Sequence, residues 1–182
     1  ALRGRALDAA QRHGDRLGDR DRALVAAWEA SKAGRHVEAE RRYREILASY
    51  PDDLEAWYEL GEVLLHRGAF LGVPLEDAEP AFERALELDP GHASALFHLS
   101  NIAAWRRDMA LLESTTRTLR ERRGGDAGIS IEAQWAFARG DSVARARAID
   151  RIAAQDTAGT SYLFAAWGGS DADAGLRLMA LA

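Results

Sequence analysis

One pattern of apolar residues and prolines occurs twice in the chain and constrains its fold more than any other feature. Each copy has three members that follow one another at intervals of four positions: Tyr43, Leu47 and Pro51, then Phe82, Leu86 and Pro90. Apolar residues at this interval lie on one face of an α-helix, and proline stops a helix because it has no amide hydrogen. The two copies are 39 positions apart, close to the period of about 34 residues that indicates a solenoid of helix pairs.

The segment between the two copies carries a more specific pattern. Its members, in chain order, are Trp57, Leu60, Gly61, Leu64, Gly68, Ala78, Phe82, Ala85 and Pro90. This pattern resembles the tetratricopeptide repeat. The resemblance implies an all-α fold, a right-handed superhelical solenoid of antiparallel helix pairs, with about 10 to 11 helices over this length.

Turn signals divide the chain into segments. We expect a capping helix or half repeat over 1–18, three repeats over 19–125, and two degenerate helix pairs over 126–182, cut off at the C-terminus. Pro51 and Pro90 are 39 positions apart, which exceeds the period of about 34. We therefore expect an insertion at 69–74, in the turn of the second repeat. The chain is expected to be part of a longer polypeptide.

Composition limits the classes of function. The chain has no cysteine, which excludes disulfides and thiolate catalysis, and its net charge of −5 argues against nucleic acid as the main ligand. It has no apolar run of roughly 18 residues, so we expect no membrane insertion and a cytoplasmic location, although an extracytoplasmic part of an anchored protein stays open. Only Lys32 among the 24 basic residues is a lysine, a bias that favours a bacterial source.

Charge is unevenly distributed along the chain. Residues 52–92 hold eleven carboxylates and two arginines, a net charge of −9. Residues 106–123 hold six arginines and three carboxylates, a net charge of +3. The arginines Arg117, Arg120, Arg122 and Arg123 could contact phosphates, but cations near a helix end also complement the helix dipole. The acidic second repeat disfavours RNA as a partner.

The family resemblance implies a concave groove lined by the first helix of each pair. The residues expected there are Trp28, Glu55, Tyr58, Glu62, His66, Phe97, Asn101 and Trp105. Aromatic side chains bury large areas at low entropic cost, and carboxylates favour a ligand with Lys or Arg. We expect a protein or peptide ligand with basic and apolar residues. The alternative is that some of these aromatic rings pack between helices.

Several short motifs have a simpler structural interpretation. Arg139-Gly140-Asp141 spells an adhesion tripeptide, but Gly-Asp is also expected where a turn leads into a helix. The five histidines form no i,i+4 pair, so we expect no metal site, and Asp171 and Asp173 are better explained by a helix cap than by a calcium loop. No arrangement of a nucleophile, a base and an acid and no phosphate loop is found, so we expect no enzyme activity and no cofactor.

The sequence thus predicts a protein-protein interaction scaffold without catalysis. The repeat region with its enlarged second turn also looks like those of larger bacterial signalling proteins, such as Ser/Thr kinases and transcriptional regulators. The alternative function is therefore that of a regulatory or sensory segment that contacts other domains of its own polypeptide.

Overall fold

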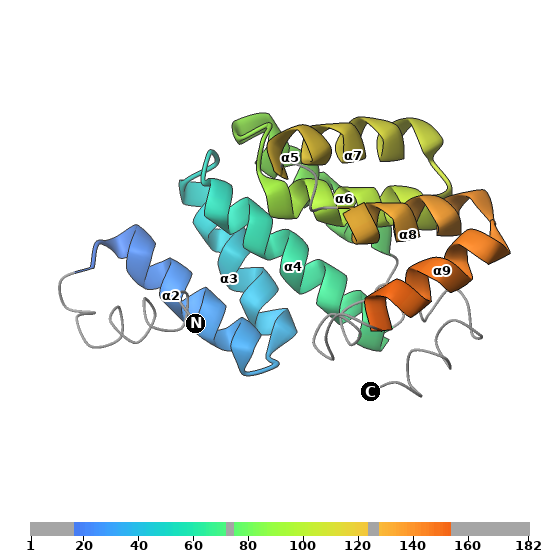
Figure 1. Cartoon of the computed structure of the whole chain (residues 1–182). Helices are drawn as coiled ribbons and strands as arrows, with labels where there is room; N and C mark the ends of the chain where they lie inside the picture. Colours follow the sequence, from blue (N-terminus) through green and yellow to red (C-terminus); the bar gives the residue numbers. More distant parts are fainter. Residues whose placement is uncertain (1–16, 72–74, 124–127, 154–182) are drawn as a thin grey trace. The chain divides into compact units, whose positions relative to one another are not determined.

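The computed structural model describes residues 17–71, 75–123 and 128–153 of the 182-residue chain (Figure 1). These residues form eight α-helices and one short 3-10 helix, and no strand occurs among them. The elements in chain order are α2 (Asp19–Lys32), α3 (His36–Ser49), α4 (Leu54–Leu71), η2 (Leu75–Ala78), α5 (Glu79–Leu88), α6 (Ala93–Arg106), α7 (Met109–Arg123), α8 (Gly128–Arg139) and α9 (Ser142–Ala153).

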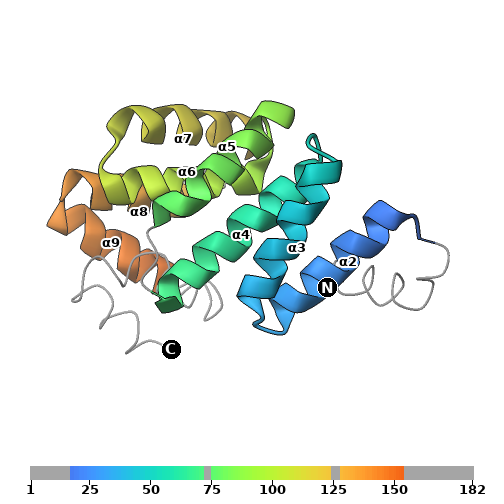
Figure 2. The ribbon, with the colours of Figure 1, turned by 180° about the vertical axis from the view of Figure 1, so that it is seen from behind.

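The chain forms two compact units, Ala1–Pro90 and Gly91–Ala182. Helices α2 to α5 belong to unit 1 and helices α6 to α9 to unit 2, and within each unit consecutive helices run antiparallel (Figures 1 and 2). The prediction of an all-α fold of helix pairs is confirmed for the described residues. The capping helix expected over 1–18 and the last helix pair lie almost wholly outside them.

Helix α4 is longer than the repeat pattern predicts. It continues through Gly68 to Leu71, where the sequence predicts the start of an insertion in a turn. Ala69 and Leu71 are good helix formers, and one glycine within a helix costs only about 1 kcal/mol relative to alanine. The surplus residues up to Leu71 therefore lengthen the helix, and 72–74 lie outside the described residues.

The core of unit 1 is built around two aromatic rings, Tyr43 on α3 and Phe82 on α5, which are both fully buried. Gly61 on α4 faces the second ring: a Cβ atom at this position would lie only 2.5 Å from Cε1 of Phe82. Real Cβ atoms do not approach a neighbouring atom so closely. Glycine at this position therefore lets α4 and α5 meet at this distance.

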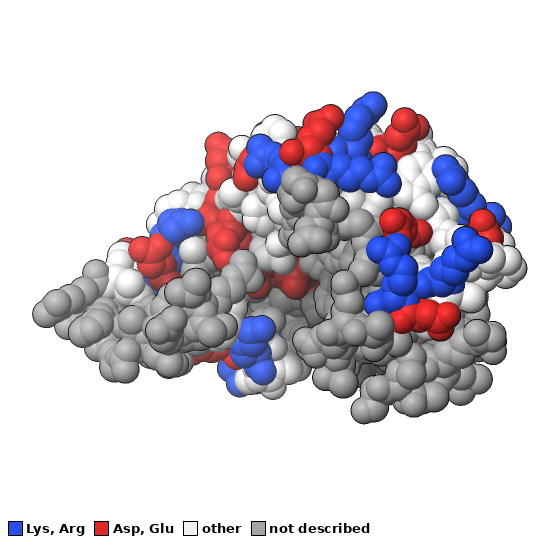
Figure 3. Space-filling model, in the orientation of Figure 1, with Lys and Arg blue, Asp and Glu red and all other residues white. Residues whose placement is uncertain are grey.

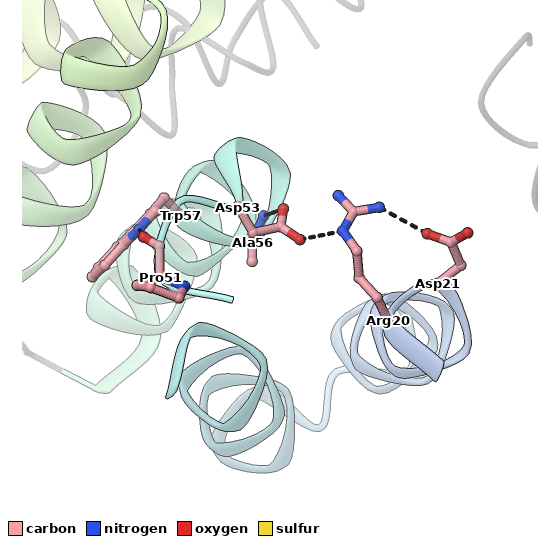
Figure 4. Close-up of polar contacts among 6 residues, drawn as sticks. All are labelled: Arg20, Asp21, Pro51, Asp53, Ala56 and Trp57. Atoms are coloured by element: carbon pink, nitrogen blue, oxygen red, sulfur yellow. Dashed lines mark hydrogen bonds and ion pairs between the residues drawn. The ribbon is translucent and has the colours of Figure 1, made fainter. Parts of the chain in front are cut away.

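The turn between α3 and α4 is held by a buried carboxylate (Figure 4). Asp53 caps α4, because its Oδ1 accepts from the Ala56 amide at 3.0 Å, and its Oδ2 accepts from Nε of Arg20 on α2 at 2.6 Å. This hydrogen bond raises the pKa of Arg20 above its usual value. Trp57, a member of the repeat pattern, is half-buried, and its Nε1 donates to the Pro51 carbonyl at 2.8 Å. The Asp53 side chain thus joins α2 to the start of α4.

Unit 2 has its own core, to which each of its described helices, α6 to α9, contributes. Its members are Ala103, Ala104, Leu112, Ala133, Phe137, Ala138, Ala148 and Ile149, with Leu111 and Trp135 packed against them. The buried amide of Gln134 on α8 also reaches α6, where its Nε2 donates to Ser100 Oγ and to Asn101 Oδ1, both at 2.8 Å. Apolar packing and this amide together fix α8 against α6.

The tight turns follow the expected chemistry with one exception. Gly34 and Gly140 both have a φ of +72°, a left-handed conformation that favours glycine. After Gly140, Asp141 caps α9 by accepting from the amides of Val143 and Ala144 at 3.1 and 2.9 Å, so the Arg-Gly-Asp motif is a turn and a helix cap, as predicted. In the turn between α6 and α7 the left-handed residue is Arg107, with a φ of +58°.

Candidate protein-binding surfaces

The residues predicted to line a groove fall on helices of both units, and each unit is described by itself. In unit 1, Trp28 is half-buried on α2, and the ammonium nitrogen of Lys32 lies 5.1 Å from the centroid of its ring. Glu55 on α4 is exposed and Glu62 is partly buried. The side chain of His66 lies outside the described part of the structure. Unit 1 therefore presents a carboxylate and part of an indole ring to solvent.

Tyr58 does not lie on a surface, and its expected position in the groove is corrected by the structure. It is only 4% exposed, and its ring centroid lies 6.1 Å from that of Phe82 in a tilted arrangement. Helix α4 packs against α3 on one side and against η2 and α5 on the other, so more than one of its faces is buried. A sequence pattern with one buried face does not predict this, and Tyr58 is a core residue.

In unit 2 the predicted residues share one face of α6. Phe97, Asn101 and Trp105 follow one another at intervals of four, which places them in a row along the helix. Phe97 is half-buried, and Trp105 at the C-terminal end of α6 is 42% exposed. The Oδ1 atom of Asn101, between them, is held by the hydrogen bond from Gln134. We call these three residues the α6 face.

A cleft of about 720 Å³ lies between α7, α8 and α9 of unit 2. Its lining residues come from one stripe on each helix: Glu113 and Arg120 on α7; Glu132, Trp135, Ala136 and Arg139 on α8; and Asp141, Ala144, Arg147, Ala148 and Arg151 on or just before α9. We call this the arginine cleft. Figure 3 shows basic and acidic side chains interleaved over α8 and α9.

The arginine cleft was not predicted from the sequence. Arg139 stood out only as part of a tripeptide and Arg120 only as part of a charge run, and no motif marked Arg147 or Arg151. The available signal was the spacing i, i+3, i+4, i+7, which both 132–139 and 144–151 follow. This spacing places each set on one helix face, but only the packing of α8 on α9 brings the two faces together.

Other kinds of site find no support in the described residues. Within them, no group of three or more His, Cys, Asp or Glu side chains is placed to hold a metal ion. None of the described helices has the length and apolar character that are needed to cross a membrane.

Comparison with known proteins places this architecture in a family. The family model described as the cilia and flagella-associated protein 70 middle TPR-like domain matches residues 16–167, which is most of the chain. No curated protein matches the chain. The match agrees with the helix pairs seen here, and it gives no support to a source in bacterial signalling. The chain belongs to the family of this middle TPR-like domain, a family of tetratricopeptide-like helical repeats.

Proposed function

We propose that this domain is a protein-interaction scaffold that binds a peptide or protein segment on the α6 face and performs no catalysis. The observation that carries the proposal is Trp105, a tryptophan 42% exposed in a row with Phe97 on a helix fixed by its neighbours. Repeats of this kind present binding surfaces and are generally scaffolds without catalytic groups.

The α6 face is a rigid surface. Gln134 holds Asn101 in place, so the backbone of α6 between the two aromatic residues is fixed to α8. An aromatic ring on such a helix buries a large area at a small loss of side-chain entropy, which is typical of binding hot spots. We expect a ligand with apolar side chains for this face. In unit 1, the exposed Glu55 favours a ligand with basic residues.

A segment from another domain of the same polypeptide would bind the α6 face through the same apolar contacts. We keep as an alternative the regulatory or sensory segment of a larger signalling protein, in which the bound segment belongs to another domain of that polypeptide. The family match names a cilia- and flagella-associated protein, and it does not speak for a Ser/Thr kinase or a transcriptional regulator.

A peptide library tests the proposal. Peptides are selected on the whole chain, and their affinity is then measured for the chain and for Trp105→Ala. We expect Trp105→Ala to weaken binding by about 2 kcal/mol, the usual loss at an aromatic hot spot. Val143→Ala is the control, since Val143 is also an exposed apolar residue of unit 2 but lies on α9. Equal affinity for the chain and Trp105→Ala would exclude the α6 face.

A further inference from the structure

We propose that the arginine cleft is a second interaction site, which binds an acidic segment of a partner protein. The proposal does not depend on the α6 face. Gln134 points toward α6, whereas Glu132, Trp135, Ala136 and Arg139 on the same helix line the cleft. At about 100° per residue these four positions are centred roughly opposite Gln134 on α8. The two surfaces therefore use different sides of this helix.

The charges of the cleft are only partly compensated. Of its four arginines, only Arg151 has an ionic partner among the described residues, and this partner is Glu132. Arg120, Arg139 and Arg147 form no ion pair within the described part of the chain, and they come from three different helices. Each of these three guanidinium groups can therefore still bind a carboxylate of a partner.

The carboxylates of the cleft cancel most of its positive charge but not all of it, because four arginines stand against Glu113, Glu132 and Asp141, a net charge of +1. Glu132 is paired with Arg151, and Asp141 already accepts from two backbone amides at the start of α9. Glu113 is exposed on α7, two helical turns before Arg120. The cleft therefore keeps an excess of positive charge. An arginine fork binds a carboxylate through two parallel hydrogen bonds, so this chemistry suits Asp and Glu side chains.

Trp135 gives the cleft a rigid apolar wall. The guanidinium carbon of Arg139 lies 4.6 Å from the centroid of the Trp135 ring. The indole Nε1 of Trp135 donates to Thr116 Oγ1 at 3.3 Å. The half-buried indole is thus held by α7 on one edge and covered by an arginine on one face. A segment that carries an apolar side chain beside its carboxylates would bury that side chain against the ring.

The lining favours a protein segment over a nucleic acid. A nucleic-acid strand carries a phosphate at each nucleotide, and with three carboxylates among the lining residues it could not keep every phosphate beside an arginine. A peptide can place its carboxylates only where the arginines are. The volume of about 720 Å³ lies within the range of sites that hold a small ligand or a few side chains.

The test uses the whole chain and a fluorescent peptide of glutamates with one leucine, followed by fluorescence anisotropy. We expect Arg147→Gln to weaken binding about tenfold, because one charge-assisted contact is lost, and Arg120→Gln/Arg147→Gln to weaken it further. Arg107→Gln is the matched control, since it removes one exposed arginine of unit 2 that does not line the cleft. Circular dichroism checks that each variant keeps its helices.

Four outcomes would overturn the proposal. The first is no binding of the acidic peptide. The second is an equal loss in Arg107→Gln and Arg147→Gln, which would show a general charge effect. The third is tighter binding of a single-stranded RNA than of the peptide, with the same loss in Arg147→Gln. The fourth is concentration-dependent self-association that Arg147→Gln abolishes, which would make a second copy of the chain the occupant. Trp105→Ala should leave peptide binding unchanged, so this test and that of the α6 face can fail separately.

Discussion

At the scale of single residues, Gly61 determines how closely α4 and α5 can approach. A Cβ atom there would overlap the fully buried ring of Phe82. We expect Gly61→Ala to lower the free energy of unfolding by about 1–3 kcal/mol, the usual cost of overpacking a core. Chemical denaturation measures this loss.

The control for Gly61 is a double-mutant cycle with Phe82→Leu. A smaller side chain at position 82 removes the overlap, so the same Gly61→Ala change should cost less in the Phe82→Leu background. An equal cost in both backgrounds would show that the loss does not arise from contact with the ring.

The backbone conformation of Arg107 allows a second prediction for a single residue. Its φ of +58° is a conformation that costs a residue with a side chain about 1–2 kcal/mol more than glycine. Arg107→Gly should therefore raise the free energy of unfolding by about 0.5–1 kcal/mol, after the larger chain entropy of glycine in the unfolded state is subtracted. Arg107→Gln keeps the strain and should leave the melting temperature near that of the parent chain. If the two variants melt alike, the turn is not strained.

At the scale of helices, Asp53 joins three elements of unit 1. It caps α4, follows the turn from α3 and binds Arg20 on α2. Asp53→Ala should lower the free energy of unfolding by about 1–2 kcal/mol, because the helix cap is lost. Asp53→Asn keeps an acceptor for the Ala56 amide and should cost only about 0.5 kcal/mol, since Arg20 is partly exposed and its ion pair is screened by solvent. A loss as large for Asn as for Ala would mean that the ion pair outweighs the cap.

The helices themselves were largely predictable from the sequence, because the signals for them are local. Gly34 and Gly140 mark turns that the structure has, and Pro51 stands just after α3. The end of α4 was not predictable from the repeat period, since Ala69 and Leu71 are equally compatible with a longer helix. A period describes the average repeat, whereas local helix propensity decides where one particular helix ends.

At the scale of the whole molecule, the surfaces were harder to predict than the fold. The α6 face follows from a spacing of four along one helix, and Trp105 is exposed at its end. Tyr58 was misplaced because its burial depends on α5 and η2 packing against a second face of α4. The arginine cleft needs three helices to meet. Such tertiary contacts leave no signal in a pattern read one helix at a time.

The most direct test of the scaffold function is hydrogen–deuterium exchange with and without a peptide selected on the whole chain. The exchange of backbone amides slows where a ligand covers or stabilises a helix. We expect new protection over α6, Ala93–Arg106, and no such protection when the same peptide is added to Trp105→Ala. Protection of α6 that needs Trp105 would establish the α6 face as the binding surface. Tight binding without any change in exchange over α6 would contradict it.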